Sequence, residues 1–493
     1  MKSNYCNAKQ SKAAATVLTI LGVALMFAGV SIPAQAQTFN VLYSFEGQSE
    51  NEGQSPWGLV QGTDGFLYGV TEGGGLQGQF DGIFFKVSTS GDLTRLCSMF
   101  TKGKCLAGGT PYASIALGSN GDFYGVDNNS NVWKVAPSGK LKVLYTGNAP
   151  ARAPVIQAST GDFYGTNYGG AYDYCYGTCG SIFKMSASGK TTTLYSFCGD
   201  PVNGICTDGS QPNLALVQGS DGNFYGTTSS GGTDGVNDGY GTIFKITLDG
   251  ALTTLYSFPG YTPPSSALIE GADGNFYGTT ATGGSGTYGA GGTFFKATPS
   301  GEVTYLYNFC SLFNCADGSD PQNIYLATDG NFYGTTQYGG VNNNNLGTLF
   351  QITPSGTLTT LVSFDGTNGY GPSGYGALMQ DTNGMLYGTM SYGGAGYPNC
   401  PGTCGGTIFS LDMGLAPFVK TLPTSGKVKA KVKILGTDLT GATSVTFNGT
   451  AATFKVASSS EITTAVPEGA TTGVVKVVTP NGTLTSNTIF QVP

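Results

Sequence analysis

The sequence predicts an all-β fold: a seven-bladed β-propeller closed by an N-terminal strand, followed by a small immunoglobulin-like β-sandwich. A motif written Asp-Gly-Asn-Phe-Tyr-Gly in its clearest copies recurs seven times at intervals of 40 to 61 residues. Each copy lies among four short runs rich in β-branched and aromatic residues, separated by Asp-Gly and similar turns, which is typical of a propeller blade. A unit of that length cannot bury its own apolar face, so neighbouring units must stack. The copies begin at Asp64, Asn120, Thr160, Asp221, Asp273, Asp329 and Asn383.

The order of runs within the repeat predicts how the ring closes. The fourth run, Leu-Tyr-Ser-Phe at 255–258, has its first copy at 42–45, before the first complete unit. The last third run, at 408–410, has no successor, because the chain continues into Ala416-Pro417. We therefore expect the N-terminal strand to complete the seventh blade and remove an exposed sheet edge. The alternative is an open solenoid, which leaves a stray strand at one end and a three-stranded unit at the other.

The N-terminus has the pattern of an export signal. Three lysines precede the apolar run 13–30, and the small-x-small sequence at 34–36 predicts cleavage before Gln37. An uncleaved membrane anchor is the alternative, because the apolar run is nearly long enough to span a bilayer. No later segment predicts a membrane-spanning helix, so we expect an exported protein that lies at the cell surface, in the periplasm or outside the cell. The predicted parts are a signal peptide at 1–36, the propeller at 37–414 and the β-sandwich at 415–493.

The charge distribution argues against nucleic acid as a partner. Residues 37–414 carry 12 basic and 26 acidic side chains, whereas 415–493 carry 7 basic and 3 acidic ones. Nucleic-acid binding needs clustered Lys and Arg, and the body of the protein is acidic. The tail lysines alternate with small or apolar residues, which is the pattern of the solvent face of a strand rather than of a phosphate site. These lysines are Lys427, Lys429, Lys431 and Lys433.

The cysteines that follow the signal fall into five close pairs. An even number of cysteines in an exported chain predicts disulfides. Structural zinc is the alternative, but it commonly uses histidine beside cysteine, and the chain has no histidine. The expected pairs are Cys97 with Cys105, Cys175 with Cys179, Cys198 with Cys206, Cys310 with Cys315, and Cys400 with Cys404.

The predicted topology divides the loops between two faces. Connections between the first and second strands, and between the third and fourth, are short and uniform, as at 220–222 and 354–356. The second-to-third and inter-blade connections are long, variable and cysteine-bearing, and variable loops on a uniform scaffold are typical of a binding surface. Tyrosines on these long loops predict a polar-aromatic surface for a glycan or a protein, although they could instead pack the loops internally. They are Tyr172, Tyr174, Tyr176, Tyr240, Tyr288, Tyr338, Tyr392 and Tyr397.

Two parts of the chain resemble known families. The repeat, clearest in Asp221-Gly-Asn-Phe-Tyr-Gly, Gly241-Thr-Ile-Phe-Lys and Leu255-Tyr-Ser-Phe, resembles the Gloeo/Verruco tandem repeat over about 39–411. That resemblance implies an exported or surface protein of unknown biochemical role. The tail, with Val445-Thr-Phe-Asn-Gly and Val475-Lys-Val-Val-Thr-Pro-Asn-Gly, resembles an immunoglobulin-like TIG/IPT domain. Such domains serve as spacers or interaction modules.

The sequence predicts no catalytic residues and no cofactor. Without histidine there is no Ser-His-Asp or Cys-His mechanism, and most aspartates lie in turns. Calcium bound at 317–320 or 234–238 is an alternative, since carboxylate and amide oxygens suit Ca²⁺, but turn chemistry explains both segments. We expect a non-catalytic binding or adhesion protein. A structural envelope component and a polysaccharide-active enzyme using carboxylates are the alternatives.

Overall fold

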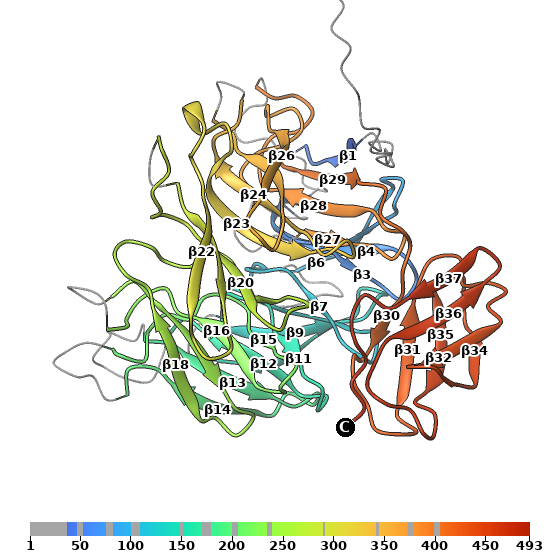
Figure 1. Cartoon of the computed structure of the whole chain (residues 1–493). Helices are drawn as coiled ribbons and strands as arrows, with labels where there is room; N and C mark the ends of the chain where they lie inside the picture. The colour runs from blue at the N-terminus through green and yellow to red at the C-terminus, as the bar shows by residue number, and fades with distance from the viewer. Residues whose placement is uncertain are drawn as a thin grey trace, which may run out of the picture. The chain divides into compact units, whose positions relative to one another are not determined.

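The structure confirms an all-β protein. It is a computed structural model that describes residues 37–46, 53–74, 82–99, 109–147, 151–169, 179–199, 206–233, 239–288, 291–341, 345–372, 378–398 and 405–493. The predicted signal peptide lies outside these residues. Within them, the helical content is one short 3-10 helix, η2 (Phe313–Cys315), and all other regular elements are strands (Figure 1). Gln37–Pro493 forms one compact unit by its internal contacts.

The described part of the repeat region folds into seven antiparallel sheets, which we number I to VII. Sheet I contains β2 (Gly53–Pro56), β3 (Val60–Gln61), β4 (Leu67–Gly74), β5 (Ile83–Val87) and β6 (Leu93–Ser98). Sheet II contains β7 (Ala116–Leu117), β8 (Phe123–Val126), β9 (Asn131–Val135) and β10 (Leu141–Thr146). Sheet III contains β11 (Ile156–Gln157), β12 (Phe163–Asn167), β13 (Ser181–Met185) and β14 (Thr191–Ser196). Sheet IV contains β15 (Val217–Gln218), β16 (Phe224–Thr227), β17 (Thr242–Ile246) and β18 (Leu252–Ser257).

The remaining three sheets follow the same meander. Sheet V contains β19 (Ile269–Glu270), β20 (Phe276–Thr280), β21 (Thr293–Ala297) and β22 (Val303–Asn308). Sheet VI contains β23 (Ser319–Leu326), β24 (Phe332–Tyr338), β25 (Thr348–Ile352) and β26 (Leu358–Ser363). Sheet VII contains β27 (Met379–Gln380), β28 (Leu386–Met390), β29 (Thr407–Asp412) and, from the other end of the chain, β1 (Thr38–Ser44).

The N-terminal strand takes the place that the repeat order predicted for it. β1 pairs antiparallel with β29, from Thr38 opposite Asp412 to Ser44 opposite Thr407. The register shifts around Leu42, and a leucine interrupts the corresponding strand pair of every other sheet in the same way. A bulge at a fixed position increases the local twist of each sheet. These bulges recur in register, but no feature of the hydrophobic pattern predicted them.

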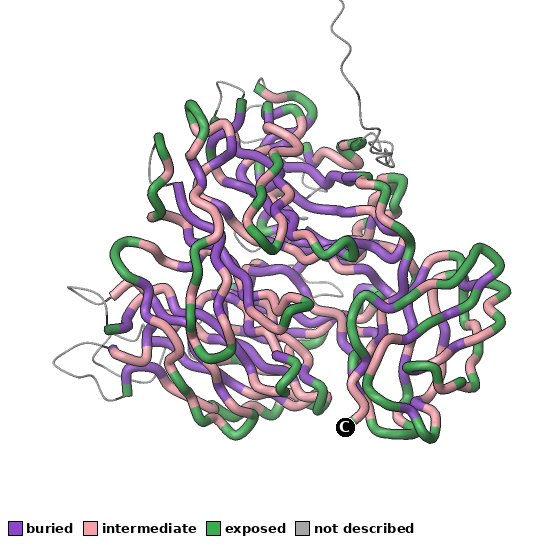
Figure 2. The backbone as a smooth tube through the Cα atoms, in the orientation of Figure 1, coloured by how far each residue is buried: buried purple, intermediate pink, exposed green. Residues whose placement is uncertain are grey.

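The motif strand packs each sheet against the next. The Tyr225 ring of sheet IV lies 4.0 Å, between centroids, from the Phe276 ring of sheet V. The same tyrosine–phenylalanine contact joins each pair of consecutive sheets from I to VI. Between sheets VI and VII a leucine replaces the phenylalanine, and Tyr333 shares a buried cluster with Leu386. The glycine that follows the motif tyrosine, such as Gly226, leaves room for an aromatic ring of the third strand in its own sheet, because a Cβ there would lie 2.5 Å from Phe244 Cζ. Buried positions concentrate in the second and third strands of each sheet, such as β16 and β17, whereas most fourth strands and turns are half-buried or exposed (Figure 2).

The first and last sheets also share a core. One buried cluster contains Leu59, Leu67 and Phe85 of sheet I together with Tyr387 and Ile408 of sheet VII. Burial of this size stabilises the pairing, because a fully buried large apolar side chain contributes about 1.5–3 kcal/mol. The two ends of the repeat region therefore pack against one another as consecutive sheets do.

The tail forms two facing sheets around its own core. The first has the order β30 (Lys420–Leu422), β31 (Lys431–Leu435), β35 (Glu461–Ala465) and β34 (Phe454–Val456). The second has the order β33 (Thr450–Ala451), β32 (Ser444–Phe447), β36 (Val475–Thr479) and β37 (Gly482–Thr485). Val432, Ile462 and Val477 belong to a buried cluster that contains no cysteine.

One detail of the tail prediction is wrong. Lys431 and Lys433 lie in β31, as predicted, but Lys427 and Lys429 lie before it in a turn. Lys429 has φ of 72°, and its backbone N–H donates to the Val466 carbonyl oxygen. A left-handed residue ends the alternation that defines a strand, so the four lysines do not share one strand face.

Candidate functional site

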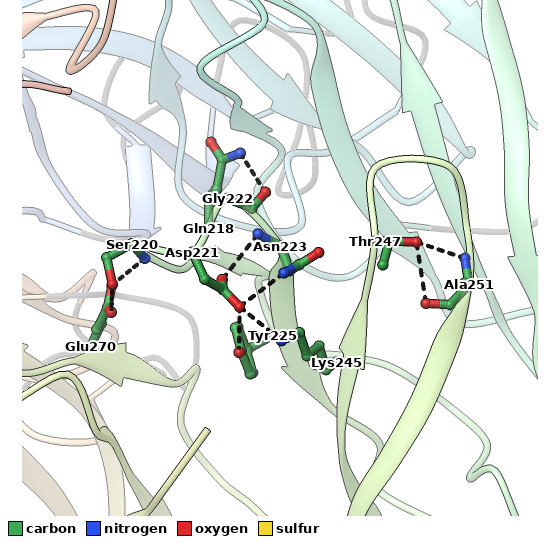
Figure 3. Close-up of polar contacts among 10 residues, drawn as sticks. All are labelled: Gln218, Ser220, Asp221, Gly222, Asn223, Tyr225, Lys245, Thr247, Ala251 and Glu270. Carbon is green, nitrogen blue, oxygen red and sulfur yellow. Dashed lines mark hydrogen bonds and ion pairs between the residues drawn. The ribbon is translucent and has the colours of Figure 1, made fainter. Parts of the chain in front are cut away.

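The repeated motif is a self-contained turn. Around Asp221, one carboxylate oxygen accepts hydrogen bonds from the Tyr225 hydroxyl at 3.0 Å and the Asn223 amide at 2.8 Å, and pairs with Lys245 at 2.8 Å (Figure 3). The other oxygen accepts the Asn223 backbone N–H at 3.1 Å. Desolvation alone would raise the pKa of Asp221, but the donors outweigh it and lower the pKa to about 2. The carboxylate thus fixes a turn and a buried tyrosine.

Two copies of the motif preserve this arrangement by moving the acid. Sheets II and III have Asn120 and Thr160 at the aspartate position, but Asp122 and Asp162 two residues later. Lys134 then pairs with Asp122 at 2.7 Å, and Lys184 with Asp162 at 2.8 Å. The pairing of a third-strand lysine with a motif carboxylate therefore survives the change. This supports turn chemistry as the role of the motif.

A second set of polar contacts joins neighbouring sheets, and the sequence analysis missed it. Glu270, at the end of β19, accepts the backbone N–H of Ser220 at 2.9 Å and its hydroxyl at 2.5 Å (Figure 3). The Gln218 amide oxygen accepts from Ser159 N–H at 2.9 Å in the same way. Gln157 and Gln380 make the same contact at 2.7 and 3.0 Å, and the Gln61 amide donates to the Thr382 hydroxyl at 2.7 Å. The recurring signal was a glutamine or glutamate three residues before the motif.

The long loops gather on the side predicted for them. Short β-bridges join the segment entering a sheet to the end of its second strand or to the loop that follows it: Ser210 with Ser230, Pro264 with Thr280, and Tyr370 with Tyr392. We call the surface formed by these two kinds of loop the long-loop face. The residues of this face lie outside the motif turn, in segments that differ between repeats, so their side chains can vary without changing the motif.

The disulfides that the structure describes lie on this face. Cys198 is bonded to Cys206 and Cys310 to Cys315, as predicted, at the entries to sheets IV and VI. Cys97 and Cys179 are also disulfide-bonded. Their expected partners Cys105 and Cys175, and the whole predicted pair Cys400 with Cys404, lie outside the described residues.

An apolar groove of about 740 Å³ lies on the described long-loop face. Leu312 and Phe313 of the Cys310–Cys315 loop form one wall, and Val341 of the β24–β25 loop forms the other. Phe313 is 69% exposed and Val341 73% exposed. Tyr288, 53% exposed, meets the Phe313 ring edge-on at 5.7 Å between centroids. The lining also includes Asn314 and Asn345 and has no charged side chain among the described residues.

Hydrogen bonds hold this groove in place beneath the exposed side chains. The buried Asp317 carboxylate accepts from the Tyr307 hydroxyl at 2.8 Å, Ser311 N–H at 2.9 Å and Leu312 N–H at 3.1 Å. The Tyr288 N–H donates to the Cys310 carbonyl at 3.0 Å, and Gly340 N–H to the Cys315 carbonyl at 3.0 Å. Burial, followed by the bond to Asp317, raises the pKa of Tyr307. The apolar side chains are thus exposed on a fixed base.

The predicted tyrosines divide into three groups. Tyr288, Tyr338 and Tyr392 are exposed, as a binding role requires. Tyr240 and Tyr397 are half-buried and pack within the loops: Tyr240 contacts Tyr261, and the Tyr397 ring covers Gly366. Tyr172, Tyr174 and Tyr176 lie outside the described residues. The structure therefore supports internal packing for Tyr240 and Tyr397, and a binding role for the three exposed tyrosines stays a prediction.

The sequence analysis did not select Leu312, Phe313 or Val341. One signal could have identified Leu312 and Phe313. They lie between two cysteines only five positions apart, and so short a disulfide loop cannot bury its own apolar side chains. Val341 had no such signal, because it is a lone apolar residue in an asparagine-rich loop. Tyr370, which contacts both Tyr392 and Tyr397, was also missed.

The predicted calcium segments are only partly described. The Asp317 carboxylate accepts the hydrogen bonds that hold the groove. Asp320, three residues later, has φ of 55°, and burial raises its pKa to about 6. Residues 234–238 lie outside the described part. Within the described residues, no three or more His, Cys, Asp or Glu side chains cluster as metal ligands would. Calcium stays an untested alternative to the prediction of no cofactor. The described residues also include no helix with the length and apolarity needed to cross a membrane.

Comparisons with solved structures give only remote likenesses. A fungal alcohol oxidase of the AA5 family, in complex with copper, is 12% identical with a TM-score of 0.48, covering 92% of this chain and 98% of that chain. A putative gluconolactonase is 12% identical with a TM-score of 0.39, covering 78% and 94%. The extracellular domain of a putative hybrid two-component system from B. thetaiotaomicron is 14% identical with a TM-score of 0.44, covering 89% of this chain and 53% of that one. These values carry no argument about activity.

Family models give a clear assignment. Among curated proteins, none matches the chain. The Gloeobacter/Verrucomicrobia repeat matches three overlapping segments, 28–205, 127–290 and 178–409, which together cover most of the chain. The IPT/TIG domain matches 418–492, where the two facing sheets of the tail lie. The chain therefore belongs to the Gloeobacter/Verrucomicrobia repeat family and carries a C-terminal IPT/TIG domain.

Proposed function

We propose that this chain is an exported, non-catalytic binding protein. Its seven repeat sheets are the blades of a β-propeller closed by β1, over 37–414, and the TIG domain follows at 415–493. The long-loop face binds a glycan or a protein at the cell surface. The signal-like sequence before Gln37 and the two disulfide loops support export, because disulfides persist in oxidising compartments.

Three contacts between sheets VII and I support the closed ring. Leu67 and Tyr387 share a buried cluster. Gln61 donates to Thr382 across the junction. Gly91 of sheet I approaches the bulged Leu42 of β1, so closely that a Cβ would lie 2.5 Å from the Leu42 oxygen. The same glycine-to-leucine approach occurs between sheets IV and V, at Gly301 and Leu255. An open array would have no such contacts at its ends.

The groove carries the binding proposal. Soluble proteins rarely leave contiguous aromatic and aliphatic side chains exposed unless these serve an interaction. Here Phe313, Tyr288 and Val341 are exposed on a base held by a disulfide and by Asp317. A preformed base lowers the ordering cost of binding. The uncharged lining suits a neutral ligand with an apolar face, such as the ring of a sugar or an apolar protein side chain.

The chemistry of the chain supports a role without catalysis. There is no histidine to act as a general base or to activate a nucleophile. The motif carboxylates are occupied by lysine, asparagine and tyrosine donors within their own turns. A carboxylate-based glycosidase would instead need two available carboxyl groups facing one another across a substrate cleft.

An array of glycans and surface proteins tests the proposal. The Gln37–Pro493 unit is expected to bind a small set of ligands, and the Phe313→Ala, Tyr288→Ala double variant to lose at least about tenfold in affinity, because buried aromatic anchors dominate binding energy. Leu248→Ala is the matched control, since Leu248 is exposed in a turn between third and fourth strands. Equal binding by the double variant and the parent would exclude the groove as the site.

A further inference from the structure

The tail carries a lysine face that the proposed function does not use. Lys433 of β31 lies opposite Thr463 of β35, and Lys455 of β34 lies opposite the same threonine. Residues directly opposite in antiparallel strands share one face, and so do residues two apart, which adds Lys431. The alternating residues Val432, Ile434 and Ile462 point into the core. We call Lys431, Lys433, Lys455 and Thr463 the lysine face.

The charges of this face are largely uncompensated. Lys433 pairs with Glu461 at 3.1 Å. Within the described residues, Lys431 and Lys455 form no ion pair, and both are exposed. The face borders a cleft of about 850 Å³, which is lined by all three lysines, Thr463 and Thr464, by apolar residues of the tail such as Leu422 and Phe454, and by Ser119 and Asn120 of sheet II. A concave basic surface attracts anions, and it does so here in a chain whose repeats are strongly acidic.

We propose that the lysine face binds an anionic polysaccharide. Strand geometry spaces the lysine Cα atoms about 6.6 Å apart along β31 and about 9.5 Å apart across β35. A sugar polymer that carries carboxylate or sulfate groups can place several charges against these lysines at once, and its hydroxyl groups suit the threonines beside the lysines. This site is separate from the groove and does not depend on the proposed function.

The surroundings favour a polysaccharide over other anions. A compact site for a single small anion uses free backbone N–H groups. Here β31 and β35 are each paired on both sides, so their N–H groups serve the sheet. Nucleic acid is disfavoured because three lysines are few for a phosphate backbone, and the acidic repeats would repel a dense polyanion.

The test uses the Gln37–Pro493 unit and polygalacturonate as the probe, with neutral dextran of similar length for comparison. Binding to polygalacturonate, but not to dextran, is expected at low salt and is lost near 1 M NaCl, where the Debye length is about 3 Å. The Lys431→Gln, Lys455→Gln variant is expected to bind at least about fivefold more weakly. The Lys476→Gln, Lys190→Gln variant removes the same charge from exposed positions elsewhere and is expected to bind as the parent does.

Three results overturn the proposal. Equal losses in both double variants would mean that net charge, not this face, drives binding. Tighter binding to a DNA duplex than to polygalacturonate would assign the face to nucleic acid. The third result is a salt-sensitive dimer in sedimentation that the Lys431→Gln, Lys455→Gln variant abolishes, together with no binding to polygalacturonate. It would mean that the lysine face binds the acidic repeats of a second copy of the chain. Matching thermal unfolding of parent and variants excludes misfolding as the cause.

Discussion

Glu270 accepts two hydrogen bonds from Ser220, one from its backbone N–H at 2.9 Å and one from its hydroxyl at 2.5 Å. The two residues are fifty positions apart and belong to neighbouring sheets V and IV. The bond therefore joins repeats rather than stabilising one. Gln157, Gln218 and Gln380 make the corresponding contact with one backbone N–H each. This predicts how substitutions at Glu270 behave.

Glu270→Ala should destabilise the protein by about 0.5–1.5 kcal/mol, because it removes the acceptor of the exposed Ser220 N–H at a sheet junction. Glu270→Gln should cost less, since an amide oxygen serves this position in three other sheets. Urea unfolding monitored by tyrosine fluorescence gives both values. Equal losses for the two variants would show that the carboxylate charge, rather than the acceptor, matters.

Ring closure is tested at Gly91. Gly91→Ala places a Cβ 2.5 Å from the Leu42 oxygen of β1, at φ of 96°. Gly222 has φ of 84° but no atom within 4 Å of its would-be Cβ, so Gly222→Ala carries only the backbone cost of about 1–2 kcal/mol. Gly91→Ala should be less stable than Gly222→Ala by a further 1–3 kcal/mol or so, the usual cost of overpacking. Similar stabilities in urea would argue that β1 does not close the ring.

Asp221 predicts an acid-sensitive contribution to stability. Its pKa is about 2 in the folded protein, against about 3.9 in an unfolded chain. A lowered pKa means that the stabilisation is full above about pH 4 and is lost as pH falls towards 2. Asp221→Asn should therefore cost about 1 kcal/mol at pH 7, after allowance for solvent screening, and almost nothing near pH 2. Glu302→Gln, at an exposed position, is the control. A pH-independent difference between parent and Asp221→Asn would contradict the ion pair as the cause.

Asp320 predicts the opposite behaviour. Burial raises its pKa to about 6, so the folded state disfavours the charged form. Stability is then full below about pH 4 and falls as pH rises towards 6. In the parent, the Gln322 side-chain amide donates to Asp320 at 2.9 Å, and Asp320→Asn keeps an oxygen that can accept this bond. Asparagine also tolerates the left-handed φ of 55° at this position. It should stabilise the protein by about 1–2 kcal/mol at pH 7 and leave it unchanged at pH 4. A loss of stability at pH 7 would mean that the charge has an unrecognised partner.

The recurring parts of the fold could be predicted from the sequence, and the groove could not. The offset copy at 42–45 placed β1 beside β29, because strand order within a repeat fixes the missing neighbour. The bond between Cys310 and Cys315 was predicted from their close spacing and from the even number of cysteines after an export signal. The contact of Glu270 with Ser220 was not predicted, because it joins two neighbouring sheets and the pattern within one repeat says nothing about which residues meet between sheets. Phe313 and Val341 were missed because they lie in loops that do not repeat, and they meet only where the segment entering sheet VI contacts the β24–β25 loop.

The tyrosines show the same limit. Tyr288 and Tyr397 look alike in the sequence, since both lie in glycine-rich loops between second and third strands. Tyr397 packs on Gly366, whereas Tyr288 stands beside Phe313 on the surface. Composition identifies an aromatic loop, but the neighbouring loop decides whether its side chain is buried.

The most direct test of the central claim is hydrogen exchange of the Gln37–Pro493 unit with and without its best array ligand. Binding at the groove predicts slower exchange in 286–288, 311–316 and 339–341, and no change in the turn 247–251 on the opposite side of the sheets. Protection confined to that turn or to the other short turns, with none in the groove segments, would contradict the account.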